Sequence, residues 1–559
     1  MKLYNIFATS LLCGAAFFMA SCNDMLETYP YGQFTDEQMD ENAVDGLMAA
    51  AYAGLEAHFI GNNEAFSGPS TNWVFDVRSD DALKGGSGTS MENNIHLLEI
   101  SSISATNPTC LFKWENNYYA ISRVHIAMRS VQNATSLSET VKAQYLGELK
   151  FLRAYYYFDL YRIFERFPYF TEDENASEIR YDRYTRAEMI GFILDDLKEA
   201  YSVLPDRQTS VGRVNKFGAA AMLARVCAYE RNWNDVATYA KAVIDCGQYA
   251  LYDNYGDMSK IEFNNTRESI LAMQCSNVNN NSHINWSNLL NITYSEGNLY
   301  GSGDDFFHAS QNLVDAFRTN PDTGLPYLND DAPAESVTSD YSGSLDPRLD
   351  YTVGRIGFPW RDNGTGKYIY GSAWIRDANT YSGYSGKKWC IDPDDPMCLK
   401  QYPYSSPLNF IFIRYADIVL LRAEALIELG QDQGLNEARD LINQVRRKAI
   451  RTVEQAGTYL PVDLDINKAD YYVEEYSSAG WTQDYARRAV RMERRLELAM
   501  EGQRWFDLCR WGNVSATMNA YFKYEANFEG YYSDASMSDD EIFLPISQTE
   551  VDRSNGLYQ

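Results

Sequence analysis

A charge-rich segment near the C-terminus, residues 487–512, constrains the fold more than any other part of the sequence. Its apolar residues recur at i, i+4, i+7 and i+8, which is the spacing of one stripe along an α-helix. They are Met492, Leu496, Ala499 and Met500. The segment is therefore predicted to be an amphipathic helix that packs one face against a core.

The acidic residues of the same segment repeat every four positions, as Glu493, Glu497 and Glu501. Arg494 and Arg504 each stand three residues from a glutamate, which is close enough to pair on a helix surface. Two carboxylates at i, i+4 could instead form a general acid/base pair. Neighbouring arginines, however, keep carboxylates ionised and make them poor proton donors. We therefore predict a structural network of ion pairs.

Two longer segments, residues 217–246 and 413–447, look like variants of one unit. Each has the pattern of a helix, a short polar turn and a second helix. Small residues stand where the two helices would approach each other, at Ala224, Ala237, Ala423 and Ala438. Antiparallel pairs of this kind are the unit of tetratricopeptide-type stacks, although the full repeat consensus is absent. The prediction is a mainly α fold of stacked helix pairs.

Other helices are indicated by capping signals. Capping-box patterns at Thr35 with Gln38 and at Thr185 with Glu188 predict the starts of two helices, the first of which runs to about residue 57. Two more helical stretches lie between them, at residues 114–131 and 141–164.

Three segments lack helical periodicity and are rich in Gly, Asn, Asp, Ser, Tyr and Trp. They are residues 66–90, 275–313 and 336–409. Irregular segments of such length inside a compact protein are usually functional. We expect them to carry the binding residues, with the helix pairs as scaffold.

Composition limits the partners and the number of domains. The chain has 559 residues and a formal net charge of −28, which repels phosphate backbones, so nucleic acid is not expected to bind. It contains 42 tyrosines and 10 tryptophans, and such rings suit stacking on sugars as well as packing. Since no long Pro/Gly/Ser linker interrupts the sequence, one compact body is predicted.

The N-terminus has the features of an export signal. Lys2 precedes an apolar stretch at residues 6–19, which is shorter than the about 20 residues that span a bilayer. The stretch ends in Ala20-Ser21-Cys22, a pattern that resembles a lipobox, in which the cysteine is acylated. We predict a signal peptide at residues 1–21 and lipidation at Cys22. The alternative is an ordinary cleavage site followed by a chance cysteine.

Neither metal-binding nor catalytic motifs are found. The five histidines are scattered, and no phosphate loop, Gly-x-Ser-x-Gly or metal-type cysteine spacing occurs. Cys390 and Cys398 bracket a short loop, and whether they form a disulfide is left open. So is calcium binding by the acidic residues at 392–395. No metal, no cofactor and no catalytic residue are predicted.

Residues 493–512, with the sequence ERRLELAMEGQRWFDLCRWG, resemble the C-terminal signature of the SusD/RagB family. Residues 147–158, GELKFLRAYYYF, are similar to another part of that family's pattern. The resemblance implies a SusD-like α-α superhelix with the ligand loops on one face. It implies a single domain at residues 22–559, with an N-terminal part to about residue 330 and a C-terminal part at about 331–559.

The same resemblance implies a function. SusD-like proteins are non-catalytic lipoproteins of the outer membrane that capture nutrients, mostly glycans, for a SusC-like TonB-dependent transporter. The expected location is the outer membrane, lipid-anchored and facing the exterior. Two alternatives remain, a RagB-type protein that captures peptides or another nutrient, and a secreted glycosidase, which needs only two suitably placed carboxylates.

The resemblance also places candidate ligand residues in the loops. The predicted glycan-binding residues are Trp73, Asp76, Arg78, Asp80, Asp81, Trp286, Tyr294 and Tyr300. Trp73 and Trp286 are interpreted as stacking platforms, with packing anchors as the alternative. Asp80 and Asp81 are interpreted as acceptors for sugar hydroxyls, or else as turn-stabilising acids. The aromatics held in reserve are Trp360, Trp374, Tyr381, Tyr384 and Trp389.

Overall fold

The computed structural model describes residues 43–55, 73–277, 285, 291–294, 299–301, 303–328, 332–361, 367–400, 405–454 and 470–558. The signal peptide, Cys22, the predicted capping box at Thr35 and the predicted ligand residue Trp286 lie outside these residues. Those predictions are therefore not tested by the structure.

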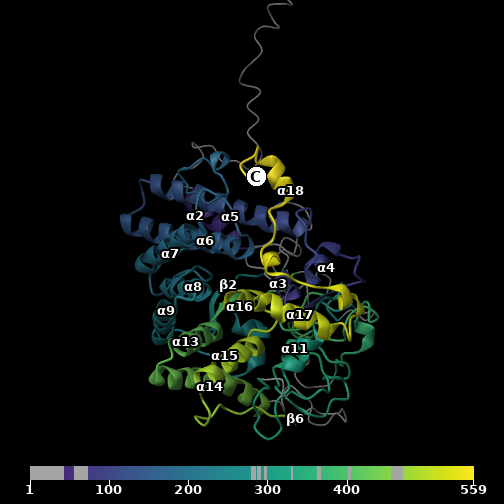
Figure 1. The fold of residues 1–559 in the computed structure, drawn as a ribbon. Helices are drawn as coiled ribbons and strands as arrows, with labels where there is room; N and C mark the ends of the chain where they lie inside the picture. The colour runs from purple at the N-terminus through teal and green to yellow at the C-terminus, as the bar shows by residue number, and fades with distance from the viewer. Residues whose placement is uncertain are drawn as a thin grey trace, which may run out of the picture.

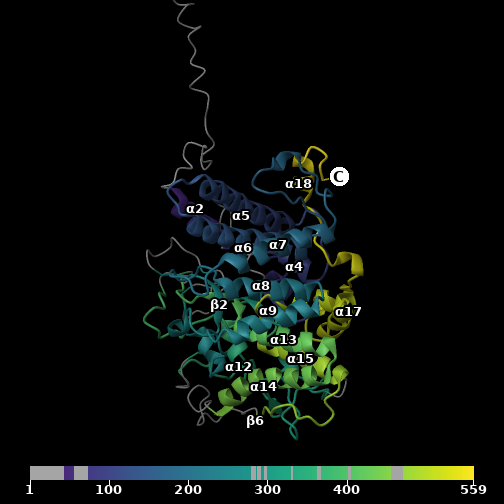
Figure 2. The same cartoon turned by 90° about the vertical axis from the view of Figure 1, so that its left-hand side faces the viewer.

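Stacked helices form the scaffold, which confirms the predicted mainly α fold (Figures 1 and 2). Its helices are α2 (Val44–Ala53), α5 (Pro108–Asn133), α6 (Glu139–Ile163), α7 (Arg186–Val203), α8 (Lys216–Tyr229), α9 (Trp233–Asp245), α13 (Tyr415–Leu429), α14 (Asp432–Glu454) and α15 (Gln483–Glu497). Each packs on the next, and α9 packs on α13, so that the two predicted helix pairs are neighbours. The stack thus joins residues far apart in the sequence.

The remaining elements are short. They are the helices α3 (Trp73–Val77), α4 (Asn93–Glu99), α11 (Gln311–Ala316), α12 (Leu349–Thr352), α16 (Arg504–Trp511), α17 (Val514–Glu525) and α18 (Gln548–Arg553). Single turns of 3-10 helix occur at Ala176–Glu178, Tyr255–Ser259, Ile261–Phe263, Ser372–Trp374, Gly530–Asp534 and Asp539–Glu541.

Local signals set the helix ends, and one of them was predicted. Thr185 and Glu188 form the expected capping box at the start of α7. Gly430, with φ of 69°, ends α13 in the left-handed conformation that glycine adopts without steric cost. Of the four alanines predicted at the contacts within the pairs, Ala224, Ala423 and Ala438 are buried and Ala237 is partly buried. Small side chains thus lie where the helices approach each other.

Three small two-stranded sheets tie the irregular segments to the scaffold. β1 (Ala82–Gly85) pairs antiparallel with β3 (Phe306–Ala309), and β2 (Ser269–Met273) pairs antiparallel with β5 (Phe410–Arg414). β4 (Ser344–Leu345) pairs parallel with β6 (Asp470–Tyr471). Each pairing joins segments that are more than 120 residues apart.

Two hydrophobic clusters are present. The main one extends through the helix stack and includes side chains from Val44 to Leu544. The second, which we call the loop cluster, is built from the irregular segments alone. Its buried members are Ile292, Tyr300, Trp360, Tyr370, Ile375 and Cys390. The loops therefore have a small core of their own.

Two predictions about local structure are wrong. Residues 73–85 are not an irregular loop, because they form α3 and β1 and are buried. The segment 487–512 is not one helix, because α15 ends at Glu497 and α16 begins at Arg504. Between them Met500 has φ of 58° and Gly502 φ of 74°, so the chain turns sharply. The turn directs Glu501 inward, where its cationic partners lie.

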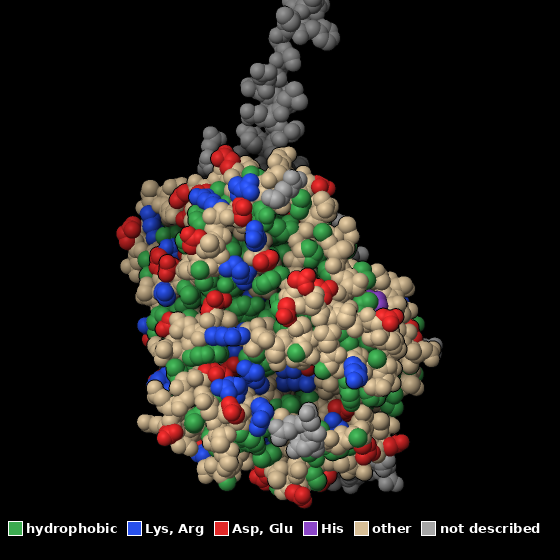
Figure 3. Space-filling view, in the orientation of Figure 1, with side chains coloured by type: hydrophobic (Ala, Val, Ile, Leu, Met, Phe, Trp, Pro, Cys, Tyr) green, Lys and Arg blue, Asp and Glu red, His purple; other side chains and the backbone are tan. Residues whose placement is uncertain are grey.

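Charged side chains of both signs lie on the surface, and the length and apolarity of the helices decide whether one could span a membrane. On the face shown in Figure 3, Asp and Glu side chains are scattered, with Lys and Arg between them. Within the described part of the chain, no helix combines the length and apolarity that crossing a membrane requires.

Candidate functional site

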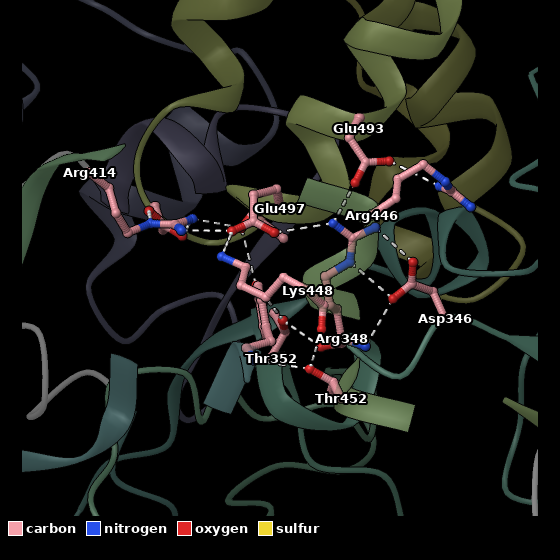
Figure 4. Close-up of polar contacts among 12 residues, drawn as sticks. Asp346, Arg348, Thr352, Arg414, Arg446, Lys448, Thr452, Glu493 and Glu497 are labelled. Atoms are coloured by element: carbon pink, nitrogen blue, oxygen red, sulfur yellow. Dashed lines mark hydrogen bonds and ion pairs between the residues drawn. The ribbon is translucent and has the colours of Figure 1, made fainter. Parts of the chain in front are cut away.

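A central ion-pair network surrounds Glu493 and Glu497 at the end of α15 (Figure 4). It contains five cations, Arg348, Lys388, Arg414, Arg446 and Lys448, and five anions, Glu268, Asp346, Glu493, Glu497 and Glu501. All ten side chains are buried. Because formal charges of both signs are equal in number, each buried charge has compensation.

Glu497 occupies the middle of the network. Its Oε1 lies 2.7 Å from Arg414 Nη1 and 2.6 Å from Lys448 Nζ, and its Oε2 lies 3.2 Å from Arg348 Nη1. Burial alone would raise the pKa of Glu497, but Lys448, Arg414 and Arg348 outweigh it and hold the pKa well below its usual range. Glu497 is thus a permanent anion and no proton donor.

The prediction of a structural ion-pair network is confirmed, but its partners were wrongly assigned. The glutamates of α15 pair with cations of other elements, not with neighbours on the same helix. Arg494 instead pairs with Asp417 and Asp507, and Arg504 pairs with Asp80. The helix therefore joins distant segments through its charges.

Asp80 and Asp81 are bound to the C-terminal segment. Arg504 donates to both oxygens of Asp80, at 2.7 and 2.8 Å, and Arg495 Nε donates to Asp81 Oδ1 at 2.7 Å. Burial opposes ionisation of Asp80, but Arg495 and Arg504 prevail and keep its pKa well below the usual range. Both oxygens of Asp80 and one oxygen of Asp81 are therefore bound by arginines, while Asp81 Oδ2 is buried without a hydrogen-bond partner among the described residues.

The neighbouring predicted residues are also enclosed. Asp76 Oδ2 accepts from the backbone N–H of Gly502 at 2.6 Å. The Arg78 guanidinium lies 4.1 Å from the ring centre of Trp505 and donates to the carbonyl of Ile542. Trp73 is 5% exposed, and its ring centre lies 5.4 Å from that of Phe307.

These five residues, Trp73, Asp76, Arg78, Asp80 and Asp81, have no surface in this conformation that a ligand can reach. Contact with a glycan would require the packing between residues 73–81 and the C-terminal segment to open. The sequence does contain a signal for these ion pairs, because the acids at 76–81 can pair with the unusually dense arginines at 487–510. It was not recognised because the two segments are over 400 residues apart.

The predicted tyrosines differ from each other. Tyr300 is buried in the loop cluster, where its hydroxyl donates to the carbonyl of Ile391 at 2.7 Å and accepts from Trp360 Nε1 at 2.9 Å. Tyr294 is 44% exposed, and the Arg376 guanidinium lies 5.5 Å from its ring centre. Among the predicted ligand residues that the structure describes, Tyr294 alone offers an accessible ring.

Two carboxylate–cation–tyrosine groups border the loop cluster. In the first, Arg376 pairs with Asp304 and lies against the ring of Tyr294. In the second, Lys367 Nζ lies 4.7 Å from the ring centre of Tyr368, and both side chains contact Asp394. Each group sets an aromatic ring beside charged donors and acceptors, a combination that suits a sugar's apolar face and hydroxyls.

The reserve aromatics belong mainly to the interior. Those buried are Trp360, Tyr381, Tyr384 and Trp389. Trp374 is partly exposed, and it packs on the loop cluster, with its ring centre 5.6 Å from Trp360 and 5.4 Å from Tyr370. Trp374 is therefore a further ring at the border of the cluster.

Two questions left open for this region concern a disulfide and a calcium site. Cys390 and Cys398 are both free thiols that contact the loop cluster, so the structure contains no disulfide between them. In the described ranges, no three His, Cys, Asp or Glu side chains are grouped so as to hold a metal ion. Asp392 and Asp395 accept from backbone N–H groups of their own turn, and Asp394 pairs with Lys367.

Comparison with known proteins covers nearly the whole chain. The model of the SusD family matches residues 267–559, and a model described as "Starch-binding associating with outer membrane" matches residues 37–227. A SusD-like protein of Bacteroides ovatus is 27% identical over 99% of this chain and 89% of its own length. SusD-like protein P25 of Formosa agariphila is 25% identical over 92% and 90%.

Solved structures show the same fold. A SusD-like protein from Bacteroides fragilis superposes with a TM-score of 0.70 at 22% identity, covering 94% of this chain and 97% of its own. Surface glycan-binding protein A from Bacteroides thetaiotaomicron, solved with laminarihexaose, gives 0.68 at 19% identity, covering 93% and 99%. The segment that matches the family model contains all ten residues of the central ion-pair network. This chain belongs to the SusD family.

Proposed function

We propose that this protein is a non-catalytic cell-surface protein that captures an oligo- or polysaccharide and delivers it to a SusC-like TonB-dependent transporter. Family membership supports this proposal. So do two proteins of the same fold, one described as a laminarin-binding SusD-like protein and one solved with laminarihexaose. A binding role also agrees with Glu493, Glu497 and Glu501, which are paired with buried cations as parts of the scaffold.

The observation that carries the proposal is the border of the loop cluster. Tyr294 is 44% exposed and lies two residues after Ile292, a buried member of that cluster. Such a ring loses little conformational entropy when a sugar stacks on it, because only two side-chain torsions need be fixed. Arg376 and Asp304 beside it supply a donor and an acceptor for hydroxyl groups. Trp286, outside the described residues, remains a predicted second platform.

Glycan-array screening followed by isothermal titration tests the proposal. Tyr294→Ala and Trp374→Ala are expected to weaken binding of the selected oligosaccharide about tenfold or more, since each loses a stacking contact worth ~1.4 kcal/mol. Tyr119→Ala is the matched control, because Tyr119 is 38% exposed but lies on α5. Absence of binding to every glycan, together with binding of peptides, would replace the proposal with RagB-type peptide capture.

The anchor is tested separately. We propose that Cys22 carries the lipid that holds the protein on the outer membrane, on the evidence of the short apolar stretch before Ala20-Ser21-Cys22. Cys22→Ala should leave the fold intact and release the protein from the membrane fraction. If the variant sediments with the outer membrane as the wild type does, lipid anchoring at Cys22 is refuted.

A further inference from the structure

A pocket of about 670 Å³ lies among α2, α6, the α7–α8 connection and the end of β2. We call it the helix pocket. It shares no lining residue with the loop cluster or its two carboxylate–cation–tyrosine groups. Its volume falls in the range of about 300–1,000 Å³ that is usual for small-molecule sites.

The floor of the helix pocket is apolar. Met48, Leu55 and Met273 line it and are buried. Val211 lies at the edge and is 69% exposed, the highest exposure among the large hydrophobic side chains that the structure describes. Val211 thus adds one accessible apolar side chain at the mouth of the pocket.

Two tyrosines form a wall and are held in place by hydrogen bonds. The Tyr52 hydroxyl donates to Glu148 Oε2 at 2.7 Å, and the Tyr145 hydroxyl donates to Asp45 Oδ1 at 3.3 Å. Arg213 lies 4.9 Å from the ring centre of Tyr145. The rings are thus oriented before any ligand arrives, which lowers the entropic cost of binding.

The rim is polar and its charges do not favour an anion. Thr209 and Ser210 are exposed there and offer hydroxyl groups. The amide of Gln274, also at the rim, is held by Asn265 and Asn409. Arg213 Nε donates to Glu148 at 2.7 Å, so this cation is already paired. Asp45 adds an exposed carboxylate. An apolar floor, fixed rings and neutral hydrogen-bonding groups match the faces and hydroxyls of an uncharged sugar.

We propose that the helix pocket is a second saccharide-binding site, specific for an uncharged sugar unit and separate from the loop cluster. This inference rests on the proposed function, because it takes the ligand to be the same glycan. With two sites on one molecule, a long polysaccharide is held at two points, and its apparent affinity exceeds that of a short oligosaccharide.

The test uses a blocking substitution. Ala49 lines the helix pocket from α2 and is exposed, so Ala49→Trp fills the pocket without removing a buried contact. Ala187→Trp, at an exposed position of α7 outside the pocket, is the matched control. Tyr145→Ala is a second variant, which removes a wall instead of filling the space. Thermal melts establish that all three variants fold.

Isothermal titration with a short oligosaccharide chosen from the array gives the number of sites. The wild type and Ala187→Trp are expected to bind two molecules and Ala49→Trp one, while Tyr145→Ala loses at least tenfold affinity at one site. Binding of one molecule that Ala49→Trp leaves unchanged and Tyr294→Ala abolishes overturns the helix pocket and leaves the proposed function standing. Failure of the wild type to bind any glycan rejects both. Equal affinity for uronic-acid and uncharged oligosaccharides at the pocket refutes its specificity.

Discussion

Glu501 lies where the chain turns between α15 and α16, and its carboxylate contacts Arg414 and Lys388. Removing it leaves these buried cations short of compensation. Glu501→Ala is therefore expected to lower the free energy of unfolding by about 3–5 kcal/mol. Denaturant titration measures the change.

Glu475 provides the control for that experiment. It pairs with Arg447 at the surface, where its side chain is 39% exposed, so Glu475→Ala should cost no more than about 1 kcal/mol. A Glu501→Ala protein as stable as Glu475→Ala would show that the central ion-pair network is dispensable for folding.

Glu529 makes stability depend on pH. Burial, then the nearby carboxylate of Glu99, raises its pKa from 4.5 to about 7, while His308 opposes the rise. The folded protein thus prefers the protonated form, and this stabilisation is complete below the unfolded pKa and is lost as pH rises through 7.

A glutamine at this position removes the titration. We expect Glu529→Gln to melt at a higher temperature than the wild type at pH 8, and the difference to shrink by pH 5. The linkage is worth at most ~3 kcal/mol. Melting curves at pH 5, 6, 7 and 8 measure it, and a constant difference between the two proteins across this range would contradict the assignment.

For single residues, the sequence predicted that the glutamates are structural ions, but it did not predict which residues they pair with. It identified Glu493, Glu497 and Glu501 as structural ions, because their charge pattern is local. It placed Asp80 in an open loop, because the arginine that binds it, Arg504, is remote in the sequence and only tertiary structure brings the two together.

Among the elements, the turn between α13 and α14 depends on one glycine. Gly430 has φ of 69°, and a Cβ there would lie 2.9 Å from Gln483 Nε2, which donates to the carbonyl of Ile427. Gly430→Ala is expected to destabilise the protein by about 1–2 kcal/mol, through the left-handed backbone and the displaced glutamine.

Gly191, within α7, is the matched control for Gly430. A Cβ added at Gly191 would meet no atom within 4 Å. Gly191→Ala should stabilise the protein by about 0.5–1 kcal/mol, since alanine favours helix. Thermal melts of Gly430→Ala and Gly191→Ala measure the two changes in stability. Equal shifts in the same direction would mean that the backbone conformation at Gly430 is not what matters.

The helices and turns that were predicted correctly are those determined by nearby residues. The helix pairs and the cap at Thr185 were predicted correctly, because periodicity and capping act within a few residues. The break between α15 and α16 was missed, because the helical pattern continues through it. At the break Met500 and Gly502 have positive φ, and Glu501 between them pairs with Arg414 and Lys388, which are remote in the sequence.

Over the whole molecule, two hydrophobic clusters imply two levels of stability. Trp360→Ala leaves a cavity in the loop cluster, where the removed ring contacts Tyr370 and Trp374. Such a cavity costs about 3–5 kcal/mol. Because the loop cluster is separate from the main one, we expect the loss to appear as faster amide exchange in residues 356–400, with the helices unaffected.

Leu223→Ala is the comparison, because Leu223 is buried in α8 within the main cluster. Hydrogen exchange followed by mass spectrometry should show reduced protection throughout the helix stack for this variant. If Trp360→Ala and Leu223→Ala produce the same pattern of exchange, the protein opens as one unit and the two clusters are not independent.

The architecture of the molecule was predictable, whereas its ligand face was not. Stacked helices follow from repeated local patterns. The accessible ring of Tyr294 and the enclosed ring of Trp73 lie in segments of similar composition, and the difference between them arises from packing against Phe307 and the C-terminal segment. A division of the chain near residue 330 stays a prediction.

The charge balance of the central ion-pair network restricts how this sequence can change over time. A substitution at Glu497 removes an anion that Arg348, Arg414 and Lys448 share, so we expect it to be accompanied by a compensating change at one of these positions. The C-terminal segment should therefore covary with remote positions, including Glu268, which shares Arg414 and Lys448 with Glu497, and Asp80, which pairs with Arg504. Grafting this segment alone into an unrelated helical protein would carry its anions without their partners.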